Sequence, residues 1–193
     1  LEGRSRSVRL ALNANGQAVA VGVRSTTLAA AYGVGRDGEL SLIANRELLD
    51  AAPVGSGFVT VGRSDREDTT DLRWHDVGET STVVTCADLL ASEKAAGPVH
   101  KHPYLSAYAG GFLDADCLLL TLEDDFDEIE VELFGWDRWR PSSHWLVVSG
   151  RPQGMIVYPD AYGLDDPAAA VPLRDGTWLT HHGETIRRWR VDH

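Results

Sequence analysis

The chain has 193 residues, of which 43% are hydrophobic, and a formal net charge of −11 at pH 7. This length fits one domain of ordinary size, and we expect a single globular domain over residues 1–193, with residues 1–7 disordered or left over from cloning. No apolar run approaches the roughly 18 to 20 residues of a membrane span, and the acidic balance argues against direct nucleic-acid binding, which relies on a basic surface.

The N-terminal quarter of the chain predicts hairpins. Apolar residues alternate before and after Asn15-Gly16, at positions 8–12 and 19–23, and Asn-Gly is a strong signal for a two-residue hairpin turn. A second hairpin is predicted between 27–34 and 39–43, around Asp37-Gly38. Residues 33–38 match the G-x-G-x-x-G dinucleotide pattern, but that site needs a following helix, whereas residues 39–42 are typical of a returning strand.

Helix signals are few. Residues 45–52 predict one or two helical turns, and residues 87–96 predict the clearest helix, with Thr85 and Asp88 as a capping pair and Gly97-Pro98 at its end. A third hairpin is predicted at Asp175-Gly176. Further strands are predicted over residues 58–61, 82–86, 117–122, 145–149, 155–158, 170–173, 177–180 and 185–191. We therefore expect an α+β, β-dominated fold: mostly antiparallel sheet built from hairpins, with one or two short helices.

Negative charge is concentrated between Asp114 and Asp137, which we call the acidic stretch. It contains ten of the 29 acidic residues and no Lys or Arg, and the other 19 acids nearly balance the 18 basic residues. A general solubilising bias would spread these charges along the chain. One short stretch therefore supplies almost the whole net charge.

Within the acidic stretch, residues 128–133 alternate glutamate with a hydrophobic residue, as in a half-buried strand that turns three carboxylates outward. These charges either protect a sheet edge from aggregation or attract a basic partner. A calcium-binding EF-hand loop is disfavoured because residues 123–128 lack the alternating acids and central glycine. For the tryptophans just after this strand, Trp136 and Trp139, we weigh two roles: packing in the core and contact with a partner. The candidate partner-binding residues are Glu123, Asp124, Asp125, Asp127, Glu128, Glu130, Glu132, Trp136 and Trp139.

Histidines form the other candidate site. His100 and His102 form an H-x-H pair, which on a strand would place both imidazoles on one face, where His182 and Glu184 could complete a metal site. The pair resembles the start of a cupin metal motif, but the glutamate of that motif is absent and Pro103 favours a loop. We expect exposed loop histidines and no cofactor, with a metal-dependent hydrolase or oxygenase as the alternative.

Two cysteines, Cys86 and Cys117, allow one disulfide at most, and no signal-peptide pattern is visible, so we expect reduced thiols and a cytoplasmic protein. No catalytic motif identifies an enzyme. The leading hypothesis is an acidic binding protein that neutralises or escorts a basic protein partner, a toxin or a nucleic-acid enzyme, as bacterial immunity and antitoxin-type inhibitors do. An accessory or structural module of a larger assembly is a further alternative. Arg187, Arg188 and Arg190 offer an internal partner for the acidic stretch.

Overall fold

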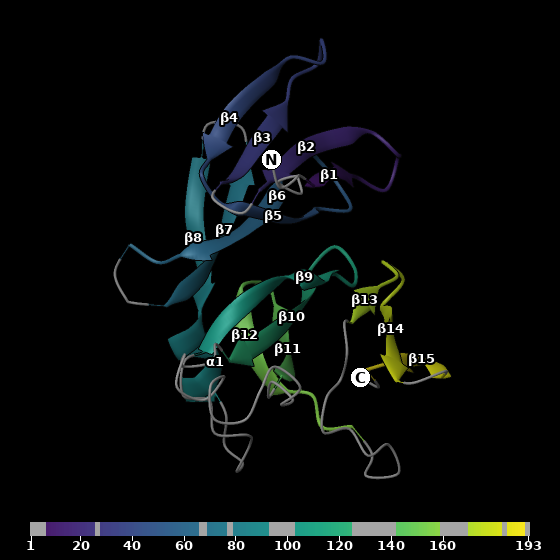
Figure 1. Cartoon of the computed structure of the whole chain (residues 1–193). Helices are drawn as coiled ribbons and strands as arrows, with labels where there is room; N and C mark the ends of the chain where they lie inside the picture. The colour runs from purple at the N-terminus through teal and green to yellow at the C-terminus, as the bar shows by residue number, and fades with distance from the viewer. Residues whose placement is uncertain are drawn as a thin grey trace, which may run out of the picture.

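A computed structural model describes residues 7–25, 28–65, 69–76, 79–92, 103–124, 142–158, 170–182 and 185–191. Within these residues the chain forms fifteen β-strands and one short α-helix. Neighbouring strands pair antiparallel throughout. The expected β-dominated, antiparallel fold is confirmed (Figure 1).

The strands form four sheets that follow one another along the chain. The first sheet contains β1 (Ser7–Leu12), β2 (Ala18–Arg24), β3 (Ala29–Val34) and β4 (Leu40–Ala44). The second contains β5 (Glu47–Ala51), β6 (Phe58–Arg63), β7 (Thr70–Asp76) and β8 (Glu79–Thr85). The third contains β9 (Pro103–Phe112), β10 (Cys117–Asp124), β11 (Ser142–Val148) and β12 (Arg151–Met155). The fourth contains β13 (Val171–Pro172), β14 (Thr177–His182) and β15 (Thr185–Arg190).

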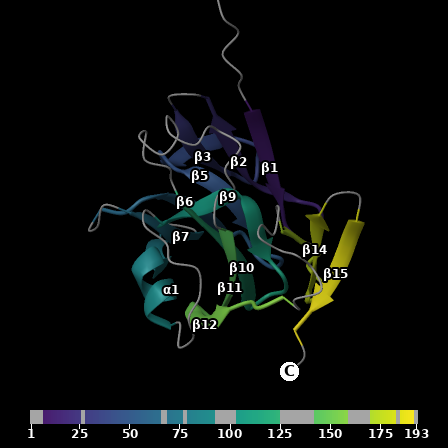
Figure 2. The same ribbon diagram turned by 60° about the horizontal axis from the view of Figure 1, so that its bottom comes forward.

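Each sheet is a meander whose strands lie in chain order, as in the four-stranded blades of a β-propeller. Figure 1 shows the first sheet at the top of the molecule and the fourth at the lower right, with the second and third sheets between them. In Figure 2 the end of β1 comes close to β14, and Arg174 of the fourth sheet contacts the Leu12 carbonyl oxygen of β1. The first and fourth sheets therefore approach each other at this end of β1.

Apolar cores lie between consecutive sheets. Between the first and second sheets, small residues of β1 to β3 pack against Leu48, Ala51 and Phe58. The sheets approach closely there, since a Cβ on Gly22 would come within 2.7 Å of the Leu48 Cβ. The largest core joins the second and third sheets and includes the buried Trp145, and a smaller core around Trp178 joins the third and fourth.

One ion pair ties all four sheets together. Arg174, in the turn between β13 and β14, contacts Asp50 Oδ1 at 2.5 Å and donates to the Leu12 carbonyl oxygen at 2.5 Å. The other oxygen of Asp50 accepts a hydrogen bond from the Phe112 backbone N–H at 2.9 Å. Gly111 (φ 141) is needed beside this contact, because a Cβ there would lie 2.6 Å from Asp50 Oδ2. Asp50 and Arg174 thus act as the hub of the fold.

The helix α1 (Cys86–Ser92) begins where the sequence predicts it, and residues 93–102 lie outside the described residues. The Thr85 backbone N–H donates to Asp88 Oδ2 at 2.8 Å, and the Asp88 N–H donates to Thr85 Oγ1 at 3.1 Å. The predicted capping pair is therefore confirmed. No helix in the described part of the chain is long and apolar enough to cross a membrane.

All three predicted hairpin turns are confirmed. Gly16, Gly38 and Gly176 have positive φ angles of 75°, 84° and 78° and follow Asn15, Asp37 and Asp175 in the turns β1–β2, β3–β4 and β13–β14. The strand β4 after Gly38 also excludes the dinucleotide-binding interpretation of residues 33–38, which requires a helix at that position.

Three sequence predictions are wrong or incomplete. Residues 45–52 form the strand β5 instead of helical turns, because β5 is covered on both faces: Leu48 packs toward the first sheet and Leu49 toward the third. Burial on both faces removes the alternation by which strands are recognised. The strand predicted at 155–158 lies instead at β12, and the strands β7 and β9 were missed, although Pro103 begins β9 as an N-terminal strand residue.

Candidate functional site

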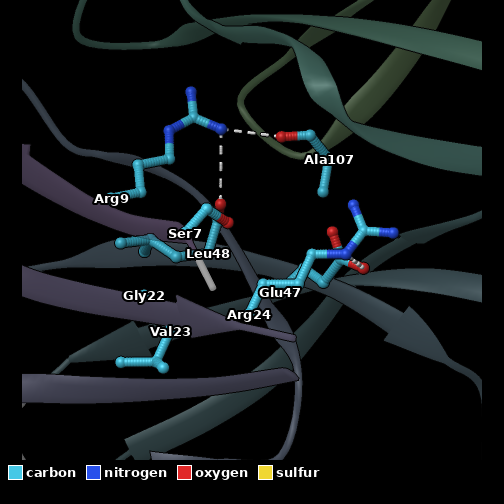
Figure 3. A pocket seen from close by; sticks show the side chains of 8 residues that line it. All are labelled: Ser7, Arg9, Gly22, Val23, Arg24, Glu47, Leu48 and Ala107. Atoms are coloured by element: carbon cyan, nitrogen blue, oxygen red, sulfur yellow. Dashed lines mark hydrogen bonds and ion pairs between the residues drawn. The ribbon is translucent and has the colours of Figure 1, made fainter. Parts of the chain in front are cut away.

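A pocket of about 450 Å³ opens where the first three sheets meet, and we call it the junction pocket. This volume is within the usual range of small-ligand and side-chain pockets. A crevice of about 60 Å³ adjoins it and shares Arg24, Glu47 and Ala107 with it (Figure 3). The polar residues that line the junction pocket are Arg24, Asn45, Arg46, Glu47, Arg63, Thr70, Tyr104, Ser106 and Glu123.

Arginines of the first sheet form one wall of this region. The Arg9 guanidinium donates to the Ala107 carbonyl oxygen at 2.7 Å and lies 3.4 Å from that of Leu48 (Figure 3). Arg24 pairs with Glu47 at 3.4 Å. Side chains of the first sheet thus contact backbone and carboxylate groups of the second and third sheets, which fixes the three sheets around the pocket.

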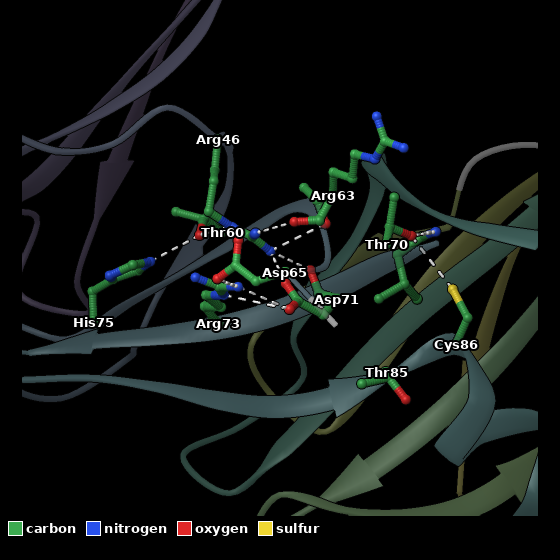
Figure 4. Close-up of polar contacts among 12 residues, drawn as sticks. Arg46, Thr60, Arg63, Asp65, Thr70, Asp71, Arg73, His75, Thr85 and Cys86 are labelled. Carbon is green, nitrogen blue, oxygen red and sulfur yellow. Dashed lines mark hydrogen bonds and ion pairs between the residues drawn. The ribbon is translucent and has the colours of Figure 1, made fainter. Parts of the chain in front are cut away.

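Arg46 forms the buried wall of the junction pocket. Its guanidinium pairs with the Asp71 carboxylate, and it donates to Thr60 Oγ1 at 3.2 Å and to the Arg63 carbonyl oxygen at 2.9 Å (Figure 4). Burial lowers the pKa of Arg46, and the Asp71 carboxylate opposes this effect. Because these donors are directed into the second sheet, Arg46 mainly shapes the pocket.

Arg73 and His75, on β7, lie beside the pair of Arg46 and Asp71, and we call these four residues the polar layer of the second sheet. Arg73 pairs with Asp65 at 2.5 Å and with Asp71 at 3.2 Å, and its hydrogen bond to Asp65 is the main cause of its raised pKa. The His75 ring contacts Thr60 Oγ1 at 2.8 Å and Thr80 Oγ1 at 3.1 Å. Burial, together with nearby Arg46 and Arg73, lowers the pKa of His75 to about 4. His75 is therefore neutral at pH 7, and both of its ring nitrogens are occupied.

A second buried histidine lies in the third sheet. His144 is 1% exposed, and its Nδ1 contacts the Tyr158 hydroxyl at 2.5 Å, which also accepts a hydrogen bond from Trp178 Nε1 at 3.0 Å. Burial lowers the pKa of His144 to about 4 and raises that of Tyr158. Because Trp178 only donates, the Tyr158 hydroxyl is free to donate to His144 Nδ1. This histidine links the third and fourth sheets and lies outside the junction pocket.

Hydrogen-bond donors and acceptors, rather than a paired nucleophile and base, line the described pocket. Glu123 accepts a hydrogen bond of 2.6 Å from the Tyr104 hydroxyl, and Glu47 holds Arg24. Within the described residues, no group of three or more His, Cys, Asp or Glu side chains is arranged to hold a metal ion. The arrangement is suited to binding a polar or charged group.

The structure divides the acidic stretch. Asp114 lies in the turn before β10, where its Oδ1 accepts hydrogen bonds of 2.9 Å from the backbone of Asp116 and Cys117. Glu123 lies near the other end of β10 and lines the junction pocket. The seven residue-to-residue steps from Asp116 to Glu123 span roughly 23 Å in an extended strand. Among the described acids of the stretch, Asp114 and Asp116 are therefore separated from Glu123 and Asp124, and Asp114 stabilises a turn.

Of the predicted partner-binding residues, the structure describes two. Glu123 lines the junction pocket, whereas Asp124 is only 6% exposed. Residues outside the described part of the chain are Asp125, Asp127, Glu128, Glu130, Glu132, Trp136 and Trp139, together with His100, His102 and Glu184 of the metal hypothesis. The backbone of His182 ends β14 and pairs with Thr185. The roles of all these residues stay predictions.

Five described arginines have carboxylate partners outside the acidic stretch. Among the C-terminal arginines, Arg188 pairs with Asp175, and it donates to Thr177 Oγ1 at 2.9 Å. The hydrogen bond from Thr177 is the main cause of the lowered pKa of Asp175. The full set of pairs is Arg24–Glu47, Arg46–Asp71, Arg73–Asp65, Arg174–Asp50 and Arg188–Asp175. These guanidinium groups are therefore engaged elsewhere in the fold.

The polar layer of the second sheet was missed by sequence reasoning, although a signal was present. In β7, Asp71, Arg73 and His75 alternate with Leu72 and Trp74, which is the period of a strand with one polar and one apolar face.

Both free cysteines agree with the sequence expectation of reduced thiols: Cys86 is buried and Cys117 is half-buried.

Comparison with known proteins gives no match, whether to a family model, a curated protein or a solved structure.

Proposed function

We propose that this chain is a cytoplasmic binding protein that neutralises or escorts a basic protein partner, such as a toxin or a nucleic-acid enzyme, as an immunity or antitoxin-type inhibitor does. The distribution of charge along the sequence carries this proposal, and the ion pairs of the described arginines are consistent with it. Five guanidinium groups take their carboxylates from outside the acidic stretch, which holds ten of the 29 acids and no basic residue. A stretch that contains many carboxylates and no Lys or Arg favours a cationic partner.

The junction pocket supports the same function. Glu123 places a carboxylate of the acidic stretch in the pocket, and Glu47 supplies a second carboxylate on its wall. Because Glu47 is already paired with Arg24, a Lys or Arg side chain of the partner would be recognised there by the Glu123 carboxylate, which the Tyr104 hydroxyl orients. Charged hydrogen bonds of this kind are roughly twice as strong as neutral ones. The pocket would then anchor a partner that the acidic stretch attracts.

The test compares two double variants with the same change in net charge. Glu130→Gln with Glu132→Gln removes charge from the acidic stretch, whereas Glu39→Gln with Glu79→Gln removes it from exposed positions elsewhere. The probes are the purified basic products of the genes next to this one, and the measurement is the association rate at low and high salt. Because electrostatic steering changes association rates by about tenfold or more, we expect slower association for the first variant only.

Equal effects of the two double variants would show that net charge alone matters and would contradict the proposal. Binding that is insensitive to both salt and the Glu130 and Glu132 changes would also contradict it.

A further variant, Glu123→Gln, tests the pocket. We expect the partner to dissociate faster with little change in the association rate, because a partly buried contact forms only after the two proteins have met.

A second function is favoured by a different feature. One face of the first sheet is apolar and exposed, with Leu10 and Leu42 each 55% exposed. Contiguous apolar surface of this kind marks interaction sites in globular proteins. An accessory or structural module within a larger assembly would present such a face. The two functions are compatible, because the acidic stretch and this face are different parts of the chain.

A further inference from the structure

The apolar face of the first sheet extends over all four of its strands. The strand register places Leu10 opposite Val21, Val21 opposite Tyr32, and Tyr32 opposite Leu42, and directly opposed residues share a face. We call this surface the outer face. Its residues, which include no Asp, Glu, Lys, Arg or His, are Val8, Leu10, Val21, Val23, Ala30, Tyr32, Val34, Leu40 and Leu42.

The two faces of the first sheet differ in how they are covered. The second sheet covers the inner face, where Ala11, Ala20 and Ala31 are buried. At the two edge strands the outer face is open: Val8 is 71% exposed and Leu40 is 56% exposed. A sheet with large apolar residues on its open face and small ones on its buried face is built to receive a second layer on the open side.

The chemistry of the outer face restricts what can cover it. Within this fold, consecutive sheets meet through apolar faces, and sheets stack about 10 Å apart. The exposed face of the fourth sheet carries Arg188 and Arg190, on the side opposite the buried Trp178. Packing that face on the first sheet would bury guanidinium groups against aliphatic side chains, at a large cost in desolvation.

We propose that two copies of this chain pair through the outer faces of their first sheets. Among the described sheets, the first is the one whose open face is apolar and uncharged, so its best match is the same face of a second copy. Such a contact is symmetric, because the same patch is used on both sides, and two-fold pairing is the commonest form of oligomer. It places sheet on sheet as in the interior of the fold.

The size of the outer face indicates the strength of this pairing. Four strands of five to seven residues span roughly 19 by 20 Å, or about 380 Å² on each copy, which is about half of the roughly 800 Å² per partner in a standard interface and is typical of a weak contact. The dimer is therefore in equilibrium with the monomer, and its population rises with protein concentration. This pairing does not depend on the acidic stretch or on the function proposed above.

Sedimentation of the full chain over a concentration series tests the pairing. We expect the mass of the wild-type protein to rise toward twice the 21.0 kDa of one chain. The variant Leu10→Lys with Leu42→Lys should remain a monomer at every concentration, because two cations would be buried at the contact. The matched control is Ile186→Lys, which changes an apolar residue that is 67% exposed on the fourth sheet and should leave the dimer intact.

Four outcomes would overturn the proposal. A wild-type chain that stays monomeric throughout the series would do so, as would a dimer that persists in the Leu10 and Leu42 variant. A dimer that is lost in Ile186→Lys, or oligomers that grow beyond two copies, would show head-to-tail packing instead. Circular dichroism checks that each variant is folded, and the milder pair Leu10→Ser with Leu42→Ser should weaken the dimer in the same direction.

Discussion

The second sheet buries charges, whereas the first sheet exposes hydrophobic side chains. In the second sheet, the side chains of Arg46 and Asp71 are 8% and 3% exposed and satisfy each other. In the first sheet, Leu10 and Leu42 are more than half exposed. The two sheets therefore present two kinds of surface. The charged side chains of the polar layer form their ion pairs within the chain, whereas the outer face of the first sheet is the one that we propose to pack against a second copy.

Removing a buried charge should have the largest effect on stability. Asp71→Ala leaves the Arg46 guanidinium buried without its carboxylate, and loss of one partner of a buried pair typically costs about 3 to 5 kcal/mol. Urea unfolding followed by tryptophan fluorescence measures this loss. Asp65→Ala is the control, because Asp65 is 79% exposed and should cost at most about 1 kcal/mol. Similar losses for both variants would show that the polar layer is not a structural element.

Acidification should weaken the fold through the two buried histidines. The pKa values of His75 and His144 are about 4 in the folded chain and 6.5 in the unfolded chain, so the unfolded chain binds more protons between these values. The free energy of unfolding should therefore fall as the pH drops from 6.5 toward 4. For each histidine, a difference of one unit between its folded and unfolded pKa values corresponds to about 1.4 kcal/mol in the free energy of unfolding.

Unfolding midpoints at several pH values check this dependence. The double variant His75→Gln with His144→Gln should show a flatter profile between pH 6.5 and 4, although it starts from a lower stability because hydrogen bonds to Thr60 and Tyr158 change. A wild-type profile that is level, or that rises as the pH falls through this window, would contradict the role of the two histidines.

Breaking the hub should loosen the fourth sheet. Arg174→Met removes the contacts to Asp50 and to the Leu12 carbonyl oxygen, and we expect a loss of about 1 to 3 kcal/mol, typical of hydrogen bonds to charged groups. Amide hydrogen exchange should accelerate most in β13 and β14. The control Arg151→Met changes an exposed arginine of β12 and should leave exchange in the fourth sheet unchanged. Uniform acceleration in all four sheets would argue against a local role for the hub.

The smallest effect on stability is expected at the outer face of the first sheet. Leu42→Lys should change the unfolding free energy of the monomer by about 0.5 kcal/mol or less, because the side chain is already exposed. Leu49→Ala, at a fully buried position of β5, should cost about 2 to 5 kcal/mol. A large loss for Leu42→Lys at low protein concentration would mean that this leucine supports its own fold rather than an interface.

Hairpins were predictable because their signals are local. Asn15-Gly16 and Asp37-Gly38 supply the positive φ angle that the turn requires, and alternating residues such as Val8 and Leu10 identify the strands beside it. The strand β5 was not predictable in this way, since both its faces are covered and its pattern has no period of two. The pairing of Arg46 with Asp71 was hidden for a different reason: the two residues are 25 positions apart and meet through the order of the strands.

The candidate site was predicted in part. The sequence located the acidic stretch and included Glu123, but it treated residues 114–137 as one field. The length of β10 separates Asp114 from Glu123, and this separation follows from the strand conformation of residues between them. Tyr104 and Glu47 were missed because they join Glu123 in the pocket only when three sheets pack together.

The sequence by itself determined the class of the fold, the three hairpin turns, the helix cap and the location of the negative charge, because each depends on residues close together in the chain. Tertiary structure decided the rest. It placed charged residues of β7 inside and left apolar residues of β1 and β4 outside, since burial depends on which faces the neighbouring sheets cover. Composition identifies a face as apolar or charged, but only packing decides whether the chain itself or a partner covers it.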